Sequence, residues 1–394
     1  MSKELRILIL NYEYPPLGGG AGIVTKHLAE KFVEDGFHVH VVTAWFPGQP
    51  EYSSEGNLSI IRLKSRRKET FRSNPLEMYS WAKHALRYFK CFSEERPFDI
   101  CLANFTMPGG IVAKYLERRW KIPYVILSHG HDIPWFAPKQ MFLWHALTFP
   151  WIRSIMRRSS ANVILTDQLK KSADAFIGKG YEHKNVVIPN GMLMDRYKSG
   201  FNNKDKVVQV LFVGRMVEQK NPITFIKACK AINDLNIPAH FTMIGDGPLK
   251  NQVEKMAIEL EVDNIDIMGQ ISHYDVLKTY EQTDVLVLPS REEAMSMVIL
   301  EALSRGIYVI STPVSGVGNL VEDNVNGHFI KYGQELSISQ AFADFYYNKY
   351  TQNYQYPEDV IKKLFSRYSW DRVAEQYIDL FAKITQVNSE VNVD

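Results

Sequence analysis

The chain has 394 residues, of which 45% are hydrophobic and 23% charged, as in soluble globular proteins too long for a single core. No apolar run approaches the roughly 18 residues that a membrane span requires, and none resembles a signal peptide. The three cysteines (Cys91, Cys101 and Cys229) are scattered without metal-binding spacing, which indicates a reducing compartment. We therefore expect a cytoplasmic protein of two domains.

The net charge of +2 conceals an asymmetry between the two halves of the chain. Residues 1–190 hold 26 Lys and Arg against 17 Asp and Glu, which is +9. Residues 191–394 hold 20 against 27, which is −7. This difference indicates that the two halves meet different ligands.

Short apolar runs alternate with helical patterns along most of the chain. The first half predicts a helix over 22–35 and strands at 5–10, 38–43, 60–63, 100–103, 124–127, 162–165 and 186–188. The second half predicts strands near 207–213, 239–244, 265–268, 284–288 and 307–311. Such alternation is typical of an α/β fold with parallel sheets covered by helices on both faces.

A turn signal, Ile188-Pro-Asn-Gly191, separates the two series of strands. It predicts an N-terminal domain over residues 1–189 and a C-terminal domain over residues 190–368. A last helical pattern over 369–386 follows, with Ser369 as its N-cap.

A glycine-rich loop that includes Gly19 and Gly20 joins the first strand to the first helix. Such a loop can cradle a phosphate or let a substrate approach the backbone. A dinucleotide-binding domain would carry an acid at the end of its second strand, but that strand ends Val42-Thr-Ala-Trp45, and the glycine spacing also differs. A nicotinamide enzyme is therefore disfavoured, and we expect the loop to face a cleft shared by two domains.

A histidine, His129, follows the strand predicted at 124–127. In this position it can hydrogen-bond a substrate hydroxyl or donate a proton, unless it is a core histidine satisfied by a neighbouring carbonyl. His131 and Asp132 can equally be the working pair. A serine hydrolase is disfavoured because the chain has no G-x-S-x-G motif. We favour His129.

Two cations, Arg215 and Lys220, lie in the loop after the strand at 207–213. A planar guanidinium and a mobile ammonium five residues apart suit a diphosphate. Two acids, Glu293 and Glu301, are separated by seven residues in the loop and helix after the strand at 284–288. A strand, a loop and a helix N-terminus form a common anion and nucleotide site, so both pairs point to a nucleotide ligand.

At this point the ordered set of motifs resembles a retaining glycosyltransferase of family 4 (glycosyltransferase group 1), over roughly residues 5–385. The motifs are Gly19-Gly20, Ser128-His129-Gly130, Ile188-Pro-Asn-Gly191, Val213-Gly-Arg215 with Lys220, Ile244-Gly-Asp-Gly-Pro248, Glu293 with Glu301, Pro313-Val-Ser-Gly316 and Asn326-Gly327. The resemblance implies the GT-B fold of two facing Rossmann-like domains with a cleft between them. It also implies that the N-terminal domain binds the acceptor, the C-terminal domain binds the nucleotide sugar, and the last helix returns to the first domain.

The resemblance also assigns roles to individual residues. Arg215 and Lys220 would neutralise the diphosphate in place of a metal, and the chain has no Asp-x-Asp motif. Glu293 would contact the hydroxyls of the transferred sugar, and Glu301 those of the ribose. Three further assignments concern the diphosphate and the sugar. The backbone near Ser296 and Met297 would bind phosphate oxygens, the Gly19 and Gly20 loop would approach the donor, and His129 would bind the sugar.

Apart from the nucleotide sugar, no cofactor or metal is expected. The expected reaction retains the anomeric configuration, a phosphate oxygen takes the acceptor proton, and Glu293 orients hydroxyls rather than acting as a base. The chain departs from the family pattern where Ala294 and Ser296 replace glycines, where Pro313-Val-Ser-Gly316 replaces a Gly-Gly pair and where Asn319 replaces an acid. We expect these changes to alter donor selectivity rather than to abolish activity.

The acceptor is indicated by cations interleaved with aromatic residues in the N-terminal half. These lie in three segments: 62–72, 135–144 and 149–158. They suit an anionic membrane surface and therefore a glycan or lipid-linked acceptor at the inner membrane face, although solvated loops and a buried helix would look similar. No nucleic-acid motif is present, so we expect no nucleic-acid partner.

Two other functions fit the same residues. A GT-B nucleotide-sugar epimerase or hydrolase would convert the donor without an acceptor. A non-catalytic partner of a transferase would bind the nucleotide sugar without turnover.

Overall fold

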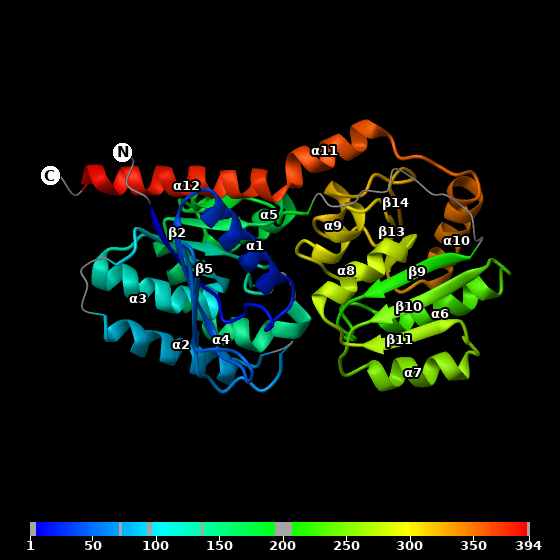
Figure 1. The fold of residues 1–394 in the computed structure, drawn as a ribbon, viewed down its shortest axis with the longest axis horizontal. Coiled ribbons are helices and arrows are strands. Elements are labelled where there is room, and N and C mark those ends of the chain that lie inside the picture. The colour runs from blue at the N-terminus through cyan, green and yellow to red at the C-terminus, as the bar shows by residue number, and fades with distance from the viewer. Residues whose placement is uncertain (1–4, 71–72, 93–96, 135–137, 194–206, 392–394) are drawn as a thin grey trace. The chain divides into compact units, whose positions relative to one another are not determined.

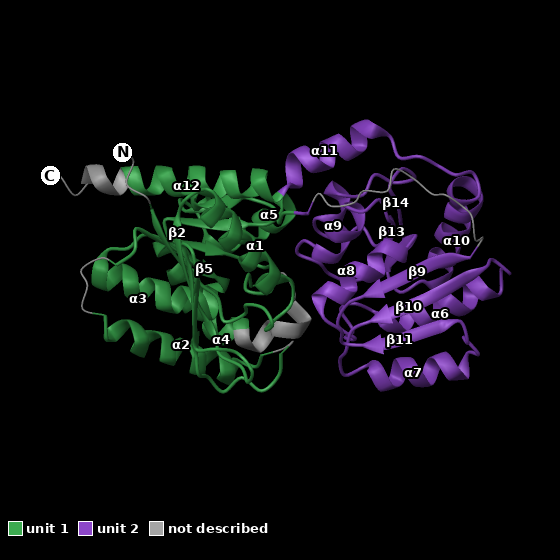
Figure 2. Cartoon of the chain, viewed as in Figure 1, with its two compact units in different colours: residues 1–191, 370–394 green, residues 192–369 purple. Residues whose placement is uncertain are grey.

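The computed structural model describes residues 5–70, 73–92, 97–134, 138–193 and 207–391, and the side chains of all these except 138–144 and 387–391. The chain divides into two compact units, each built on a sheet flanked by helices (Figures 1 and 2). Unit 1 comprises residues 1–191 and 370–394, and unit 2 comprises residues 192–369. The turn signal in the sequence predicts the first boundary after residue 189.

Unit 1 contains an eight-stranded sheet with the order β3-β4-β2-β1-β5-β6-β7-β8. Its strands are β1 (Arg6–Leu10), β2 (His38–Ala44), β3 (Tyr52–Glu55), β4 (Leu58–Leu63), β5 (Ile100–Asn104), β6 (Tyr124–Leu127), β7 (Ala161–Ile164) and β8 (Asn185–Val187). Its helices are α1 (Gly20–Glu34), α2 (Pro75–Lys90), α3 (Gly110–Trp120), α4 (Pro138–Arg158), α5 (Asp167–Ile177) and α12 (Trp370–Val391), with short turns η1 (Phe105–Gly109) and η2 (Glu182–Lys184).

Unit 2 contains a six-stranded sheet with the order β11-β10-β9-β12-β13-β14. Its strands are β9 (Val208–Val213), β10 (Ala239–Ile244), β11 (Ile265–Gly269), β12 (Val285–Leu288), β13 (Tyr308–Ser311) and β14 (Gly327–Phe329). Its helices are α6 (Pro222–Asn233), α7 (Lys250–Glu259), α8 (His273–Gln282), α9 (Met297–Leu303), α10 (Glu335–Phe345) and α11 (Glu358–Tyr368), with short turns η3 (Val317–Asn319) and η4 (Tyr346–Tyr350).

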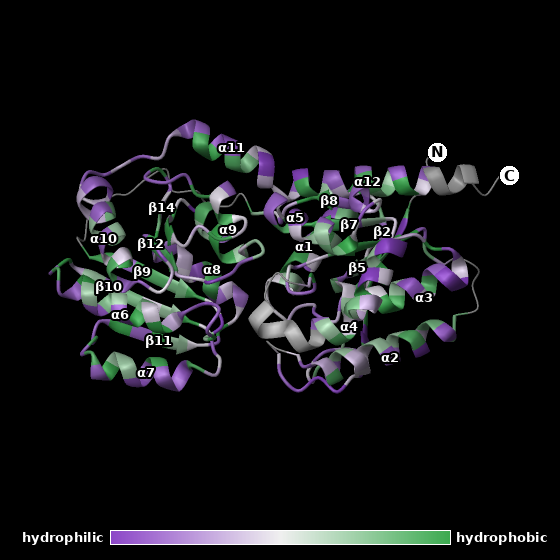
Figure 3. Cartoon of the chain, turned by 180° about the vertical axis from the view of Figure 1, so that it is seen from behind, coloured by the Kyte–Doolittle hydropathy of each residue, from purple (hydrophilic) through white to green (hydrophobic). Residues whose placement is uncertain are grey.

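The continuous apolar runs of the sequence form the central strands because both faces of each sheet are covered by helices. Every residue of β5, β6, β7, β12 and β13 is buried. The outer helices α2, α7 and α12 carry both hydrophobic and hydrophilic residues, as Figure 3 shows. No helix in the described ranges is long and apolar enough to cross a membrane.

The last helix, α12, packs against α1 within unit 1. The Phe32 ring lies 6.2 Å from the Tyr377 ring and 5.6 Å from the Phe381 ring. The Lys31 ammonium lies 2.7 Å from an Asp371 carboxylate oxygen. These contacts attach the C-terminal segment to the unit that begins the chain.

The prediction of two α/β units with parallel sheets is confirmed, with three corrections. Unit 1 also contains an antiparallel pair, because β3 pairs with β4 in the opposite direction. Neither β3 nor β14 was predicted, since β3 is polar and mostly exposed and the Gly-His-Phe sequence of β14 forms no apolar run. The last helix extends through Val391 rather than ending at residue 386.

Candidate functional site

The candidate site of unit 2 lies where the strand order of its sheet reverses. The order β11-β10-β9-β12-β13-β14 places β9 beside β12, and all of these strands are parallel. Chain connections leave β9 and β12 in opposite directions at this point, which opens a crevice at the carboxyl ends of the two strands. The loop containing Arg215 and Lys220 follows β9, and the loop containing Glu293 follows β12. The fold therefore brings together three residues that the sequence singles out.

An ion pair joins these two loops. The Lys220 ammonium lies 2.5 Å from the Glu293 carboxylate, which also accepts a 2.6 Å hydrogen bond from the Ser290 hydroxyl. The pair is largely buried, since the side chains of Lys220 and Glu293 are 14% and 7% exposed. Because Ser290 lies two residues after β12, this hydrogen bond ties the carboxylate to the end of that strand. The sequence predicted Lys220 and Glu293 but missed Ser290, three residues before the acid.

Gln219 supplies two further ties between the loops. Its side-chain amide donates a 2.9 Å hydrogen bond to the Glu292 carbonyl oxygen, and its own carbonyl oxygen accepts one of 2.7 Å from the Arg291 amide. Arg215, in contrast, is an exposed residue of the loop that carries Lys220. The site thus combines a fixed ion pair with a guanidinium accessible to a ligand.

Several buried polar atoms in these loops have no hydrogen-bond partner among the described residues. They are Gln219 Oε1, Asn221 Nδ2, Arg291 Nε, Glu292 Oε2 and Ser296 Oγ. Buried polar groups are almost always paired, and exceptions concentrate where a ligand or water supplies the partner. This mixture of donors and acceptors matches the chemistry of hydroxyl and phosphate groups.

Glu301 lies on α9, and other side chains hold both of its oxygens. Tyr280 donates a 3.1 Å hydrogen bond to Oε2, and His273 Nε2 lies 2.9 Å from Oε1. Burial and the nearby Glu301 charge raise the pKa of the Tyr280 hydroxyl, which therefore stays protonated and donates. Tyr280 and His273 were missed by the sequence analysis, although both lie on α8 at a spacing of two helical turns.

The Gly245–Gly247 loop packs against the backbone of the Arg215 loop. Gly245 and Gly247 have φ values of +141° and +157°. A Cβ atom at these glycines would overlap the carbonyl oxygens of Gly214 and Met216, respectively. Only glycine allows this close approach, so the motif supports the loop that carries Arg215.

The candidate site of unit 1 occupies the equivalent edge of its own sheet. The order reverses between β1 and β5, and Gly19 and Gly20 follow β1. Both glycines are exposed at the start of α1, and no side chain that the structure describes caps that helix. Its first backbone N–H groups therefore lack a side-chain cap at the carboxyl edge of the sheet.

His129 lies at the same edge, after β6. Its Nε2 lies 2.9 Å from the Asn104 side-chain oxygen, which also accepts a 3.2 Å hydrogen bond from the Thr25 hydroxyl. Burial lowers the pKa of His129 to about 4, while the nearby Asp132 charge opposes this shift. The ring is therefore neutral at pH 7, with Nε2 as donor and Nδ1 as acceptor. This favours a hydrogen-bonding role over proton donation.

The alternative pair, His131 and Asp132, has a structural role in this loop. Asp132 accepts hydrogen bonds from the Ser128 hydroxyl at 2.7 Å and from the backbone amides of His129 and Thr106 at 3.1 and 2.9 Å. The carboxylate therefore holds the His129 loop against η1. The His131 carbonyl oxygen accepts a hydrogen bond of 3.0 Å from the His145 ring.

The basic run over residues 62–68 is partly internal, contrary to its interpretation as a surface segment. Arg62 and Arg67 are each only 8% exposed. Arg62 donates a 2.9 Å hydrogen bond to Ser53, and Arg67 donates to the carbonyl oxygens of Glu69 and Thr70 at 2.8 and 3.0 Å. Residues 71–72 and the side chains of 135–144, which belong to the same prediction, lie outside the described residues.

Comparisons with known proteins concern the family and the fold of the chain. The family model described as "Glycosyl transferases group 1" matches residues 194–363, and that described as "Glycosyltransferase Family 4" matches residues 18–196. The chain is 31% identical to the Escherichia coli UDP-Gal:alpha-D-GlcNAc-diphosphoundecaprenol alpha-1,3-galactosyltransferase over 279 residues, which are 66% of this chain and 69% of that enzyme.

Solved structures show the same fold at low sequence identity. Sucrose-phosphate synthase from Thermosynechococcus elongatus matches with a TM-score of 0.83 at 17% identity, covering 98% of this chain and 100% of that one. Anabaena HepE in complex with UDP-glucose matches with a TM-score of 0.73 at 15% identity, covering 96% and 100%. The chain therefore belongs to the group 1 glycosyltransferases and is a transferase with the GT-B fold.

Proposed function

We propose that the enzyme transfers a hexose from a UDP- or GDP-linked donor to a hydroxyl of a glycan or lipid-linked acceptor, with retention and without a metal. The observation that carries this proposal is the ion pair of Lys220 and Glu293, which lies where the strand order of unit 2 reverses between β9 and β12. It supports a site where a cation meets a diphosphate and an acid meets sugar hydroxyls, on two loops fixed to one sheet.

Arg215 and Lys220 neutralise the donor diphosphate. The exposed guanidinium offers a planar set of donors, and Lys220 shares its charge between Glu293 and a phosphate oxygen. As the bond between the anomeric carbon and the phosphate oxygen breaks, its electron pair passes to the diphosphate. Two cations at that position stabilise the developing charge without a metal.

Retention follows if the acceptor hydroxyl attacks the face from which the diphosphate leaves. The new bond joins the acceptor oxygen to the anomeric carbon, and the released proton passes to a phosphate oxygen. Glu293 orients the hydroxyls of the sugar, because its carboxylate is already held by Lys220 and Ser290. His129 accepts a hydrogen bond from a sugar hydroxyl through Nδ1, while Nε2 stays bonded to Asn104.

The remaining contacts with the donor come from α9, from the residue that precedes it and from the start of α1. Glu301 binds the ribose hydroxyls, with Tyr280 and His273 fixing its orientation. Ser296 contributes its unpartnered hydroxyl and, with Met297, backbone N–H groups to the phosphates. The exposed Gly19 and Gly20 backbone approaches the donor at the start of α1.

The donor and acceptor classes are supported by the relatives. The E. coli relative uses UDP-galactose and a diphosphoundecaprenol-linked sugar, as its name states. A Campylobacter jejuni relative, 23% identical over 330 residues, is named for transfer to an undecaprenol-diphosphate-linked glycan. We therefore favour a UDP-hexose donor and a lipid-linked sugar acceptor. Unit 1 binds the acceptor at an anionic membrane surface on the cytoplasmic side.

Calorimetric titration of UDP, GDP and ADP in EDTA tests the proposal. Arg215→Ala should abolish binding of one nucleotide, and Lys227→Ala, which removes an exposed cation on α6, should not. Loss of binding in both variants would indicate attraction by overall charge. If folded wild-type protein binds no nucleotide without a metal, the metal-free diphosphate site is wrong.

Product analysis separates the transferase from the alternative functions. A transferase releases the nucleoside diphosphate and forms a new glycoside with the acceptor. An epimerase changes the sugar and leaves the nucleotide attached, whereas a hydrolase releases free sugar. A non-catalytic partner binds the donor without turnover.

A further inference from the structure

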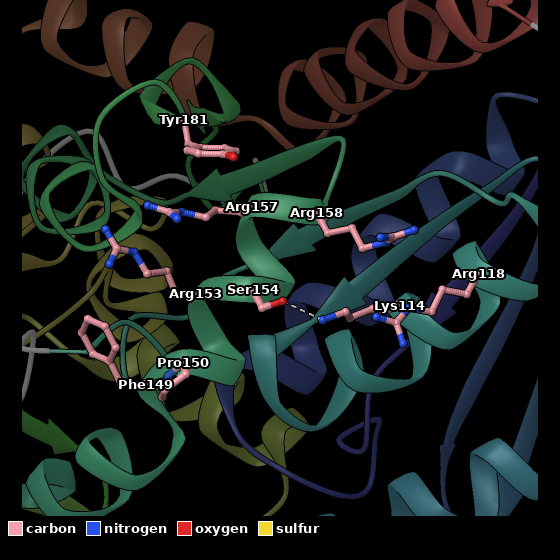
Figure 4. A pocket seen from close by; sticks show the side chains of 9 residues that line it. All are labelled: Lys114, Arg118, Phe149, Pro150, Arg153, Ser154, Arg157, Arg158 and Tyr181. Atoms are coloured by element: carbon pink, nitrogen blue, oxygen red, sulfur yellow. Dashed lines mark hydrogen bonds between the residues drawn. The ribbon is translucent and has the colours of Figure 1, made fainter.

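Unit 1 contains a cationic pocket between α3 and α4 that has no part in the proposed reaction (Figure 4). Its volume is about 530 Å³, and five of its lining residues are cationic. We call it the α3–α4 pocket; it is lined by Lys114, Arg118, Phe149, Pro150, Arg153, Ser154, Arg157, Arg158 and Tyr181. None of the described residues that line it is acidic, so its chemistry suits an anion.

Hydrogen bonds to the backbone at the end of α5 hold two of the guanidinium groups in place. Arg153 and Arg157 donate hydrogen bonds of 3.2 and 2.8 Å from Nε to the Ile177 carbonyl oxygen. Arg157 also lies over the Tyr181 ring, with its guanidinium carbon 4.5 Å from the ring centroid. Each Arg uses one donor in this way and retains others, so the pair is pre-organised for an anion with several oxygens.

The α3 side of the pocket brings like charges together. Lys114 donates a 2.8 Å hydrogen bond to the Ser154 hydroxyl. Burial, followed by the neighbouring charges of Arg118 and Arg158, lowers the pKa of Lys114. The nearby Glu117 binds Arg158 through hydrogen bonds of 2.6 and 3.0 Å. One acid beside five cations leaves a net positive charge that a bound anion would offset.

An apolar groove adjoins this pocket. It has a volume of about 360 Å³ and shares Lys114 and Arg118 with the α3–α4 pocket. The rest of its lining is Leu86, Met107, Ile111, Tyr115, Trp151 and Ile155. Trp151 is 65% exposed, and Leu147, one turn earlier on α4, is 74% exposed. A cationic pocket continuous with an apolar groove fits a ligand that is anionic at one end and hydrophobic at the other.

The position of the α3–α4 pocket separates it from the candidate catalytic residues. The end of α3 leads into β6, the end of α4 leads into β7, and Tyr181 precedes β8. These elements therefore approach the amino ends of parallel strands, whereas His129, Gly19 and Gly20 follow the carboxyl ends. A phosphate bound by Arg153 and Arg157 would therefore lie toward the opposite edge of the unit 1 sheet from His129.

We infer that the α3–α4 pocket binds the phosphate headgroup of an anionic lipid, whose hydrocarbon chain lies along the groove beside Trp151. The inference rests on the proposed work of unit 1 at a membrane surface and assigns residues to that contact. The lipid here is an anchor, distinct from the acceptor. Exposed Trp and Leu beside Arg and Lys are the residues that interfacial helices use for this purpose.

Co-sedimentation with phosphatidylcholine vesicles, with or without phosphatidylglycerol, tests this inference on the full chain. Arg153→Gln/Arg157→Gln should weaken binding to phosphatidylglycerol vesicles about thirtyfold, since each cation at an anionic surface contributes about fivefold. Lys114→Gln/Arg118→Gln should do the same while leaving the Ile177 hydrogen bonds intact. The matched control, Lys255→Gln/Lys362→Gln, removes two charges from side chains of unit 2 that are 78% and 70% exposed and should change little.

The apolar groove has its own matched pair of variants. Trp151→Ala should weaken vesicle binding on the order of tenfold, because a large apolar side chain leaves the membrane interface. Tyr274→Ala removes an aromatic ring of unit 2 that is equally exposed, at 65%, and should have no effect. Equal losses in both variants would overturn the groove assignment.

Two outcomes would overturn the lipid assignment as a whole. The first is an equal loss in the pocket variants and the unit 2 control, which would indicate attraction by overall charge. The second is calorimetric binding of inorganic phosphate that the pocket variants lose, without capture of wild type by phosphatidylglycerol vesicles; the ligand would then be a soluble anion. UDP titration of the same variants should be unchanged, so failure of this inference is distinguishable from failure of the donor site.

Discussion

Breaking the ion pair of Lys220 and Glu293 should destabilise unit 2 and uncouple its two site loops. The two charges lie 2.5 Å apart, so at an effective dielectric constant of about 20 they attract by roughly 7 kcal/mol. Desolvation of two largely buried groups offsets much of this attraction. Removal of one partner from a buried pair costs about 3–5 kcal/mol, because the other charge stays buried without compensation. Since Lys220 is 14% exposed, we expect Lys220→Met to lower the free energy of unfolding by about 3 kcal/mol, the lower end of this range.

The distribution of tryptophan gives an assay that separates the two units. All seven tryptophans lie in residues of unit 1, and unit 2 has none. Denaturant unfolding followed by far-ultraviolet circular dichroism reports both units, whereas tryptophan fluorescence reports unit 1. Lys220→Met should therefore move the dichroism transition and leave the fluorescence midpoint in place.

A double-mutant cycle with Glu293→Gln decides whether the pair is coupled. Lys220→Met/Glu293→Gln should cost about 2 kcal/mol less than the sum of the single variants, because the double variant leaves no lone buried charge. Single costs that add to within about 0.5 kcal/mol would refute the reasoning. In that case Ser290 alone would be sufficient to hold the carboxylate.

Three further predictions follow from the contacts of the two sites. Tyr280→Phe removes the hydroxyl that donates to Glu301 and should destabilise unit 2 by about 1–2 kcal/mol and weaken UDP binding; unchanged calorimetric affinity would show that Glu301 needs no such support. The unfolded chain protonates His129 near its usual pKa of about 6.5, whereas the folded chain does so only near pH 4. Unit 1 should therefore lose stability as the pH falls between these values, and His129→Gln should flatten the fluorescence-monitored profile. Ser296→Ala removes a buried hydroxyl that has no partner among the described residues, so it should stabilise ligand-free unit 2 by about 1 kcal/mol yet weaken donor binding; a loss of stability would mean that the hydroxyl is paired.

The central strands could be predicted from sequence because a parallel sheet buries both faces and so leaves continuous apolar runs. The strand Tyr52–Glu55 gave no such signal, since it pairs along only one edge and its side chains are mostly exposed. Likewise, Arg62 was interpreted as a surface cation because it lies in a basic run. Arg62 instead lies on β4, where its side chain is buried and hydrogen-bonds Ser53. The charge pattern of the segment does not reveal this burial.

In the candidate site, too, some residues could be predicted from the sequence and others could not. Arg215, Lys220 and Glu293 could be found because each follows an apolar strand, and parallel strands place their carboxyl ends at one edge. The groups that orient them could not be found, because they come from other elements. Asn104, which hydrogen-bonds His129, lies at the end of β5, 25 residues earlier in the chain. Tyr280 hydrogen-bonds Glu301 from a different helix.

The α3–α4 pocket shows how far a linear pattern can carry an inference about a surface. The aromatic and basic residues at 149–158 were visible in the sequence, but alone they fit a buried helix equally well. Lys114 and Arg118 make the difference, since they bring cations from α3 to the same cavity. In a parallel α/β unit, consecutive helices on one face of the sheet return toward the amino edge of the strands, away from the catalytic loops. A binding surface can therefore form there under constraints independent of the reaction, as the proposed lipid contact of unit 1 requires.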